Sequence, residues 1–188
     1  MKFNGRVLLF TIILIVIATA CKFFFGPSLT WSGFSPVIAI ALFSGMMIKD
    51  KSKLFILPLI AVLASDLAIQ GLHALGYFPY AGFYKGQWLN YSFLLLATLI
   101  GVAVKGRSYT GLLLGAIAAP TVFFLVSNFS VWASSAGFYT KDFQGLMTCY
   151  TAALPFYKNA LMATLLFVPV IMFVYTSVVK NRPALTLA

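Results

Sequence analysis

The sequence predicts an all-α membrane protein, a single integral membrane domain (residues 1–188) built as a bundle of six transmembrane helices with both chain ends on the cytoplasmic side. Hydrophobic residues make up 62% of the chain and charged residues 9%, and the mean hydropathy is +1.00. A soluble domain averages roughly 45–50% apolar and 25% charged residues. The apolar residues form six runs, most near the ~20 residues that a bilayer requires, and basic residues gather in alternate connections between them.

The first two apolar runs cover residues 7–25 and 36–48. The second is short for a span, which favours a tilted or partly re-entrant helix. At the end of the first, residues 18–21 (ATAC) loosely imitate a lipoprotein cleavage site. Such a site more usually has leucine three positions before the cysteine. We therefore interpret Cys21 as a small apolar residue near the end of the first span.

The third and fourth runs cover residues 54–75 and 89–104, and the third contains Asp66, one of only three acidic residues in the chain. Gln70 and His73 follow at four and seven positions, so a helix places all three side chains on one face. A carboxylate in such a run costs roughly 2.5–3.5 kcal/mol on insertion scales, so it needs a partner or a function. Asp66 is expected either to lock neighbouring helices by an internal hydrogen bond or to form one wall of a polar pocket.

The fifth run, residues 112–133, contains Pro120 near its middle, which predicts a kink. Asn128, Trp132 and Ser135 repeat the same spacing of polar side chains at its outer end. Two polar stripes cost least when both avoid lipid, so we expect the faces of Asp66 and Asn128 to line one cavity.

The sixth run covers residues 159–179 and opens with Asn159. The segment before it, residues 134–158, is predicted to be the longest of three outer loops. Long loops in a compact protein usually carry function or close over a ligand.

The distribution of basic residues predicts the orientation. Nine of the thirteen basic residues fall on one side of the expected bundle, and the positive-inside rule makes this side cytoplasmic. These nine are Lys2, Arg6, Lys49, Lys51, Lys53, Lys105, Arg107, Lys180 and Arg182. The other four are Lys22, Lys85, Lys141 and Lys158. Because the cations are scattered between apolar runs, they favour contact with lipid headgroups and do not favour nucleic acid as a partner.

Polar side chains gather in the outer halves of the spans, above nearly pure apolar inner halves. This pattern favours capture of a small solute from outside over a proton relay or an ion channel, which need polar groups through the full depth. Asp66 and Asn128 would orient polar groups of the solute, and Trp132 would stack on a ring. The candidate substrate-binding residues are Asp66, Gln70, His73, Asn128, Trp132 and Asn159 in the spans, with Trp31, Tyr84 and Tyr150 closing the pocket from loops.

Signatures of catalysis are missing from the sequence. There is no phosphate-binding loop ending in Gly-Lys-Ser or Gly-Lys-Thr, no Gly-x-Ser-x-Gly elbow and no His-Glu-x-x-His motif. We expect a protein that is not an enzyme and has neither a cofactor nor a resident metal. The single imidazole, His73, would be the ligand for any metal centre carried by the solute.

Several short motifs together resemble a bacterial family of unknown function whose members are described as transport proteins. The family is similar to the substrate-binding S components of energy-coupling-factor (ECF) vitamin transporters. The resemblance covers about residues 30–170. The chain departs from it at residues 162–165 (MATL), where the family would have Gly-Asp-Leu. The matching residues are Ser35-Pro36-Val37, Ala41 to Gly45, Ser65-Asp66 with His73, Ser127-Asn128-Phe129, Val131-Trp132, Cys149-Tyr150, Ala153 to Phe156, and Asn159.

The resemblance implies a six-helix protein of the bacterial cytoplasmic (inner) membrane that holds a vitamin near the outer surface beneath loops. Most S components work with a transmembrane coupling protein and two ATPases, and some relatives work without a dedicated module. We therefore expect uptake of a small vitamin-like solute from the outer side. The alternative is a structural or assembly subunit of a membrane protein complex, with small-residue helix faces that bind other proteins.

Overall fold

Six helices and no strands are present in the computed structural model, which describes residues 5–51, 53–104, 108–134 and 138–180. The expected all-α membrane protein is confirmed, since five of these helices are long and apolar enough to cross a membrane. The helices are α1 (Gly5–Phe25), α2 (Val37–Met47), α3 (Ile56–Ala74), α4 (Gln87–Val104), α5 (Tyr109–Ser134) and α6 (Phe143–Val178).

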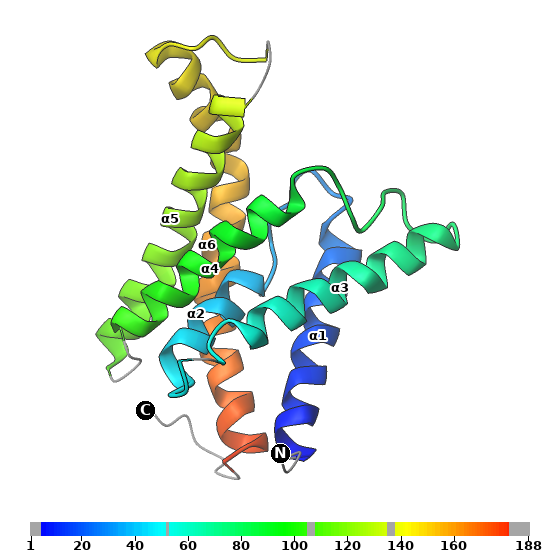
Figure 1. The fold of residues 1–188 in the computed structure, drawn as a ribbon, viewed down its shortest axis with the longest axis vertical. Helices are drawn as coiled ribbons and strands as arrows, with labels where there is room; N and C mark the ends of the chain where they lie inside the picture. The colour runs from blue at the N-terminus through cyan, green and yellow to red at the C-terminus, as the bar shows by residue number, and fades with distance from the viewer. Residues whose placement is uncertain (1–4, 52, 105–107, 135–137, 181–188) are drawn as a thin grey trace.

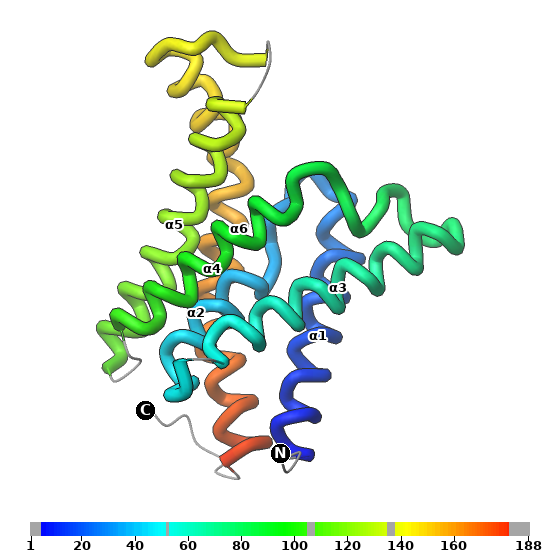
Figure 2. Tube along the Cα trace, viewed as in Figure 1, coloured from blue at the N-terminus to red at the C-terminus, as the bar shows by residue number. Residues whose placement is uncertain are grey.

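α5 and α6 form a hairpin, and α3, α4, α5 and α6 all contact the short helix α2 (Figure 1). α5 and α6 run side by side, and their connected end extends beyond the rest of the molecule. α3 and α4 cross the bundle at a steep angle, with α3 packed on α1 and α4 packed on α2 and α5. The start of α1 and the ends of α2, α4 and α6 lie toward one end of the molecule, as Figure 2 shows.

The short helix α2 is the centre of the core. It has 11 residues, ten of which are buried, because it contacts α3, α4, α5 and α6. At ~1.5 Å per residue it is about 16 Å long, against the ~30 Å of a hydrocarbon layer. The second of the six expected spans is therefore a helix as predicted, but it is a buried core helix too short to cross a bilayer alone.

Two glycines let α2 and α4 cross at close range. A Cβ on Gly45 would lie 1.9 Å from the carbonyl oxygen of Thr98, and one on Gly101 would lie 2.2 Å from that of Leu42. Real Cβ atoms do not approach this closely, so only glycine fits at either position. The crossing fixes α4 against the core and so places its outer half beside the site described below.

The sixth helix is much longer than the sequence predicts. It has 36 residues and begins at Phe143, so the predicted outer loop over residues 134–158 is wrong for its larger part. Asp142 caps the helix, since its carboxylate accepts a hydrogen bond from the Gly145 amide at 2.7 Å. Polar side chains such as Gln144 made this stretch resemble a loop, but they lie on an exposed face of the helix.

Candidate functional site

A cavity of about 500 Å³ lies between the helices, within the ~300–1,000 Å³ typical of small-molecule sites. All six helices contribute to its wall, together with the segments before α2 and before α4. The lining residues are Lys22, Gly33, Ser35, Val37, Ile38, Val62, Asp66, Tyr84, Gln87, Asn90, Tyr91, Leu94, Pro120, Phe123, Phe124, Ser127, Asn128, Val131, Ala153, Phe156, Tyr157 and Ala160.

One wall of the cavity carries an ion pair between Lys22 of α1 and Asp66 of α3. Only 23% of the Lys22 side chain and 10% of the Asp66 side chain are exposed. The Lys22 ammonium also donates a hydrogen bond of 2.7 Å to the Ser65 hydroxyl. The charge that the sequence places inside an apolar run is therefore compensated by a cation from another helix.

The second carboxylate oxygen of Asp66 is held by α4. The Gln87 side-chain amide donates to it at 2.6 Å, and the Tyr91 hydroxyl donates to it as well. Gln87 also donates to the carbonyl oxygen of Gly82 at 3.2 Å and accepts from the Tyr84 amide at 3.1 Å. Asp66 thus joins α1, α3, α4 and the segment before α4 in one buried polar cluster.

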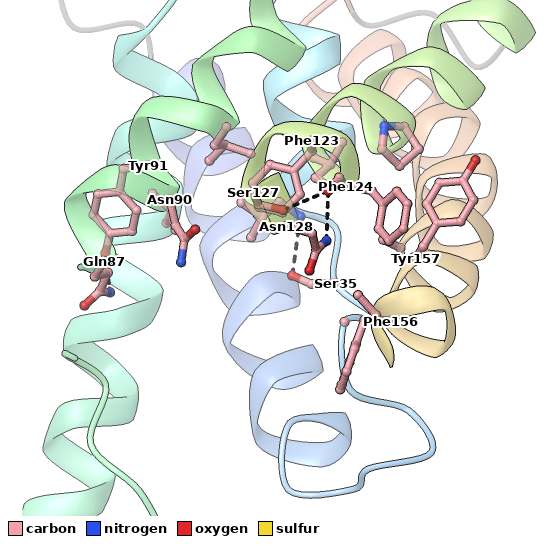
Figure 3. A pocket seen from close by; sticks show the side chains of 18 of the residues that line it. Ser35, Gln87, Asn90, Tyr91, Phe123, Phe124, Ser127, Asn128, Phe156 and Tyr157 are labelled. Atoms are coloured by element: carbon pink, nitrogen blue, oxygen red, sulfur yellow. Dashed lines mark hydrogen bonds between the residues drawn. The ribbon is translucent and has the colours of Figure 1, made fainter. Parts of the chain in front are cut away.

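The opposite wall is aromatic and comes from α5 and α6 (Figure 3). Phe123, Phe124, Phe156 and Tyr157 line it. The rings of Phe124 and Tyr157 pack with their centroids 4.8 Å apart. This wall offers flat apolar surface of the kind on which a planar ring packs.

Two amide side chains face the space between these walls. Asn128 of α5 donates to the Phe124 carbonyl oxygen at 2.8 Å, and Asn90 of α4 donates to the Tyr84 hydroxyl at 2.6 Å. Figure 3 shows both amides beside the cavity, with Ser35 close to Asn128. Asp66 and Asn128 line the same cavity, although the rest of the two predicted faces does not, and Tyr84 lines it as well.

Gln70 and His73, which the sequence assigned to the pocket, instead hold the α3–α4 connection in place. Gln70 accepts hydrogen bonds from the Gly82 and Phe83 amides at 3.0 and 3.3 Å. His73 Nδ1 lies 2.9 Å from the Phe78 carbonyl oxygen, so this nitrogen carries the proton. Neither residue lines the cavity.

Asn159 and Trp31 also lie outside the lining. The buried Asn159 amide donates to the carbonyl oxygens of Thr30 and Ser32 at 2.8 and 2.9 Å, which anchors the α1–α2 connection to α6. Trp31 packs against Phe25 and Phe34 within this connection. Both residues support the segment that brings Ser35 to the cavity.

Two further candidates, Trp132 and Tyr150, lie away from the cavity, and Ser135 of the predicted polar stripe is not described. Trp132 donates through its indole nitrogen to the Thr140 carbonyl oxygen at 2.9 Å and does not line the cavity. Tyr150 lies within α6 and not in a loop, where its hydroxyl donates to the Leu125 carbonyl oxygen at 2.8 Å. Ser135 lies outside the described residues.

Lys22, Gln87 and Tyr91 are site residues that the sequence pattern did not predict. The sequence places Lys22 among the outer cations, although an isolated buried carboxylate requires a partner of opposite charge. Gln87 and Tyr91 are four positions apart, a spacing that places both on one helix face. That pair was the available signal on α4.

The fold and the site define a multi-pass all-α membrane protein with a mainly apolar cavity between its helices and a buried ion pair on the cavity wall. The chain belongs to a family of unknown function (DUF6580), whose pattern matches residues 1–185. No curated protein and no solved structure matches the chain.

Proposed function

We propose that this protein is a membrane transport protein that binds a small vitamin-like solute from the outer side and takes it up. The observation that carries the proposal is the cavity of about 500 Å³ with walls from all six helices. Its lining combines apolar and aromatic surface with a few converging polar side chains, a composition typical of small-molecule sites.

The proposed location is the bacterial cytoplasmic membrane, with the cavity in the outer half of the bundle. Its supports are the asymmetry of basic residues in the sequence and the origin of lining residues at the end of α1 (Lys22) and at the starts of α2 (Val37) and α4 (Gln87), away from the end where α2, α4 and α6 finish. A resemblance to ECF S components supports a coupling protein and ATPases as partners in uptake. The residues proposed to bind the solute are now those that line the cavity, led by Asn90, Asn128 and Tyr84.

Mass spectrometry of a heat-denatured extract of the purified protein tests the proposal. We expect a small molecule in the extract at a molar ratio approaching one. As a matched control we choose Ala153→Trp, because Ala153 is a small residue on the cavity wall and a large ring there would fill the space. The extract of that variant should lack the compound.

The competing function is a structural subunit of a membrane complex. Asp66 favours it, because its carboxylate is already satisfied by Lys22, Gln87 and Tyr91 without any ligand. An empty extract from the original chain, together with another membrane protein retained through purification, would support this function and reject uptake.

A further inference from the structure

The charges on the cavity wall cancel. Lys22 and Asp66 are the only described lining residues that are charged at neutral pH, and they pair directly. The sum of their charges is zero whether the proton stays on the ammonium or moves to the carboxylate. The wall therefore presents no uncompensated charge to an occupant.

The hydrogen-bonding groups that remain open are neutral. Among the described residues, Oδ1 of Asn90 and Oδ1 of Asn128 accept no hydrogen bond, while the nitrogen of each amide donates one. The Tyr84 hydroxyl accepts from Asn90 and retains its own proton for donation. These groups can take donors and one acceptor on the edge of a ring that packs against the aromatic wall.

We propose that the cavity selects an uncharged compound with a flat ring and hydrogen-bond donors on its edge, and that the Lys22–Asp66 pair sets this selectivity. An ion that enters a mainly apolar cavity loses its hydration and meets no counter-charge. A neutral ring loses less hydration free energy than an ion does, and it gains contact with the rings of Phe124 and Tyr157. The inference rests on the proposed function, because it assumes that the cavity holds a solute.

The original pair and three variants of it differ in the charge of the cavity wall while nearly keeping its shape. The original pair sums to zero, Asp66→Asn leaves one positive charge and Lys22→Gln leaves one negative charge. The double variant Lys22→Gln/Asp66→Asn is neutral again and is the matched control. Asparagine and glutamine retain hydrogen-bonding groups toward Gln87, Tyr91 and Ser65.

Three probes of similar shape report the preference of each version: quinoline-3-carboxamide, quinoline-3-carboxylate and the N-methylated cation of the carboxamide. Dissociation constants are measured by equilibrium dialysis on protein that elutes as a single species. We expect the original chain and the double variant to bind the neutral carboxamide at least about tenfold more tightly than either ion. Asp66→Asn should shift the preference toward the carboxylate, and Lys22→Gln should shift it toward the cation.

The second measurement is the net charge at pH 7 of the compound in the denatured extract. It tests the charge selectivity of the cavity even if a single variant does not fold or no probe binds. A neutral compound supports the inference. A charged compound, or a probe preference that is the same in all four versions, overturns the charge selectivity and leaves uptake standing. An empty extract together with no probe binding overturns the proposed function and, with it, this inference.

Discussion

Asp66 unites the two roles that the sequence left open. It is a lock between helices, because its carboxylate bonds to Lys22 on α1 and to Gln87 and Tyr91 on α4. It is also part of the cavity wall. A buried ion pair of this kind contributes little net stability, yet removal of one partner is costly because an uncompensated charge remains.

Lys22→Met should therefore lower the free energy of unfolding by roughly 3 kcal/mol, because the buried Asp66 carboxyl would lose the partner that compensates its charge. Chemical denaturation in detergent, followed by circular dichroism, measures the change. The double variant Lys22→Met/Asp66→Leu removes both charges and should recover most of the loss. If the double variant is as unstable as the single one, the ion pair is not the cause.

Single residues were predictable where their own sequence context was unusual. A carboxylate in an apolar run is conspicuous, so Asp66 could be found. Lys22 could not be identified with the same ease, because a lysine at a helix end ordinarily extends to the headgroups. Its partner is 44 positions away in the chain, and that pairing depends on the packing of α1 on α3, which no local pattern shows.

At the scale of helices, the crossing of α2 and α4 is the tightest contact to test. Gly45→Ala and Gly101→Ala would each bring a methyl group into backbone atoms of the other helix. We expect each substitution to lower the melting temperature, because forced separation of the helices lowers the free energy of unfolding by about 1–3 kcal/mol.

Gly71→Ala is the matched control for this crossing. It lies inside α3, and nothing lies within 4 Å of an added Cβ. Alanine favours a helix over glycine by up to about 1 kcal/mol, so this variant should be unchanged or more stable. Equal losses at all three glycines would show that the close crossing is not responsible.

The cap of α6 gives a second test at this scale. The Gly145 amide and then the Thr140 hydroxyl, which donate to Asp142, lower the pKa of this carboxyl below its ordinary value of 3.8. The charged cap thus stabilises the first turn fully above that value, and this contribution is lost only as the pH falls through the lowered pKa. Protection of the amides of residues 143–146 from hydrogen exchange should stay constant from pH 7 to about 4.

Asp142→Ala should increase exchange at these amides across the whole range, whereas Asp142→Asn, which keeps a capping side chain, should retain most of the protection. Mass spectrometry of peptides from this region makes the comparison. If alanine and asparagine behave alike, the side chain does not cap the helix in solution.

Helix boundaries were predictable wherever a span is bounded by charge or by glycine. The predicted bounds of the first five helices agree with the structure within three residues. The start of α6 was missed because residues 143–158 mix glycine, proline, threonine and glutamine with apolar residues, and a search for continuous apolar spans passes over such a stretch. No local pattern could show that Asn159 faces the α1–α2 connection, since that contact joins residues 127 and 129 positions apart.

For the molecule as a whole, the orientation in the membrane stays a prediction. The structure places the start of α1 and the end of α6 toward one end, as the N-in and C-in arrangement requires. Lys2, Lys105, Arg107 and Arg182, which also support the arrangement, lie outside the described residues. The sequence predicts that successive connections between helices lie on alternate sides of the membrane. Which side faces the cytoplasm depends on the positive-inside rule.

Cysteine labelling in intact cells tests this direction. We expect a membrane-impermeant maleimide to label Lys85→Cys, in the α3–α4 connection, and not Lys51→Cys, in the α2–α3 connection, because both side chains are exposed but lie toward opposite ends. The native Cys21 and Cys149 are buried and are replaced by alanine in the background. Labelling of position 51 alone would invert the proposed orientation and move the cavity to the cytoplasmic side.

The pairing of Lys22 with Asp66 also affects biogenesis. α3 enters the bilayer with Asp66 near its middle, at a cost of roughly 2.5–3.5 kcal/mol for the lone carboxylate. α1 is synthesised first, so Lys22 is already present when α3 leaves the translocon, and neutralisation can accompany insertion. We therefore expect the two charges to depend on each other during membrane insertion as well as in the folded state. We also expect relatives that lack one charge to lack or replace the other.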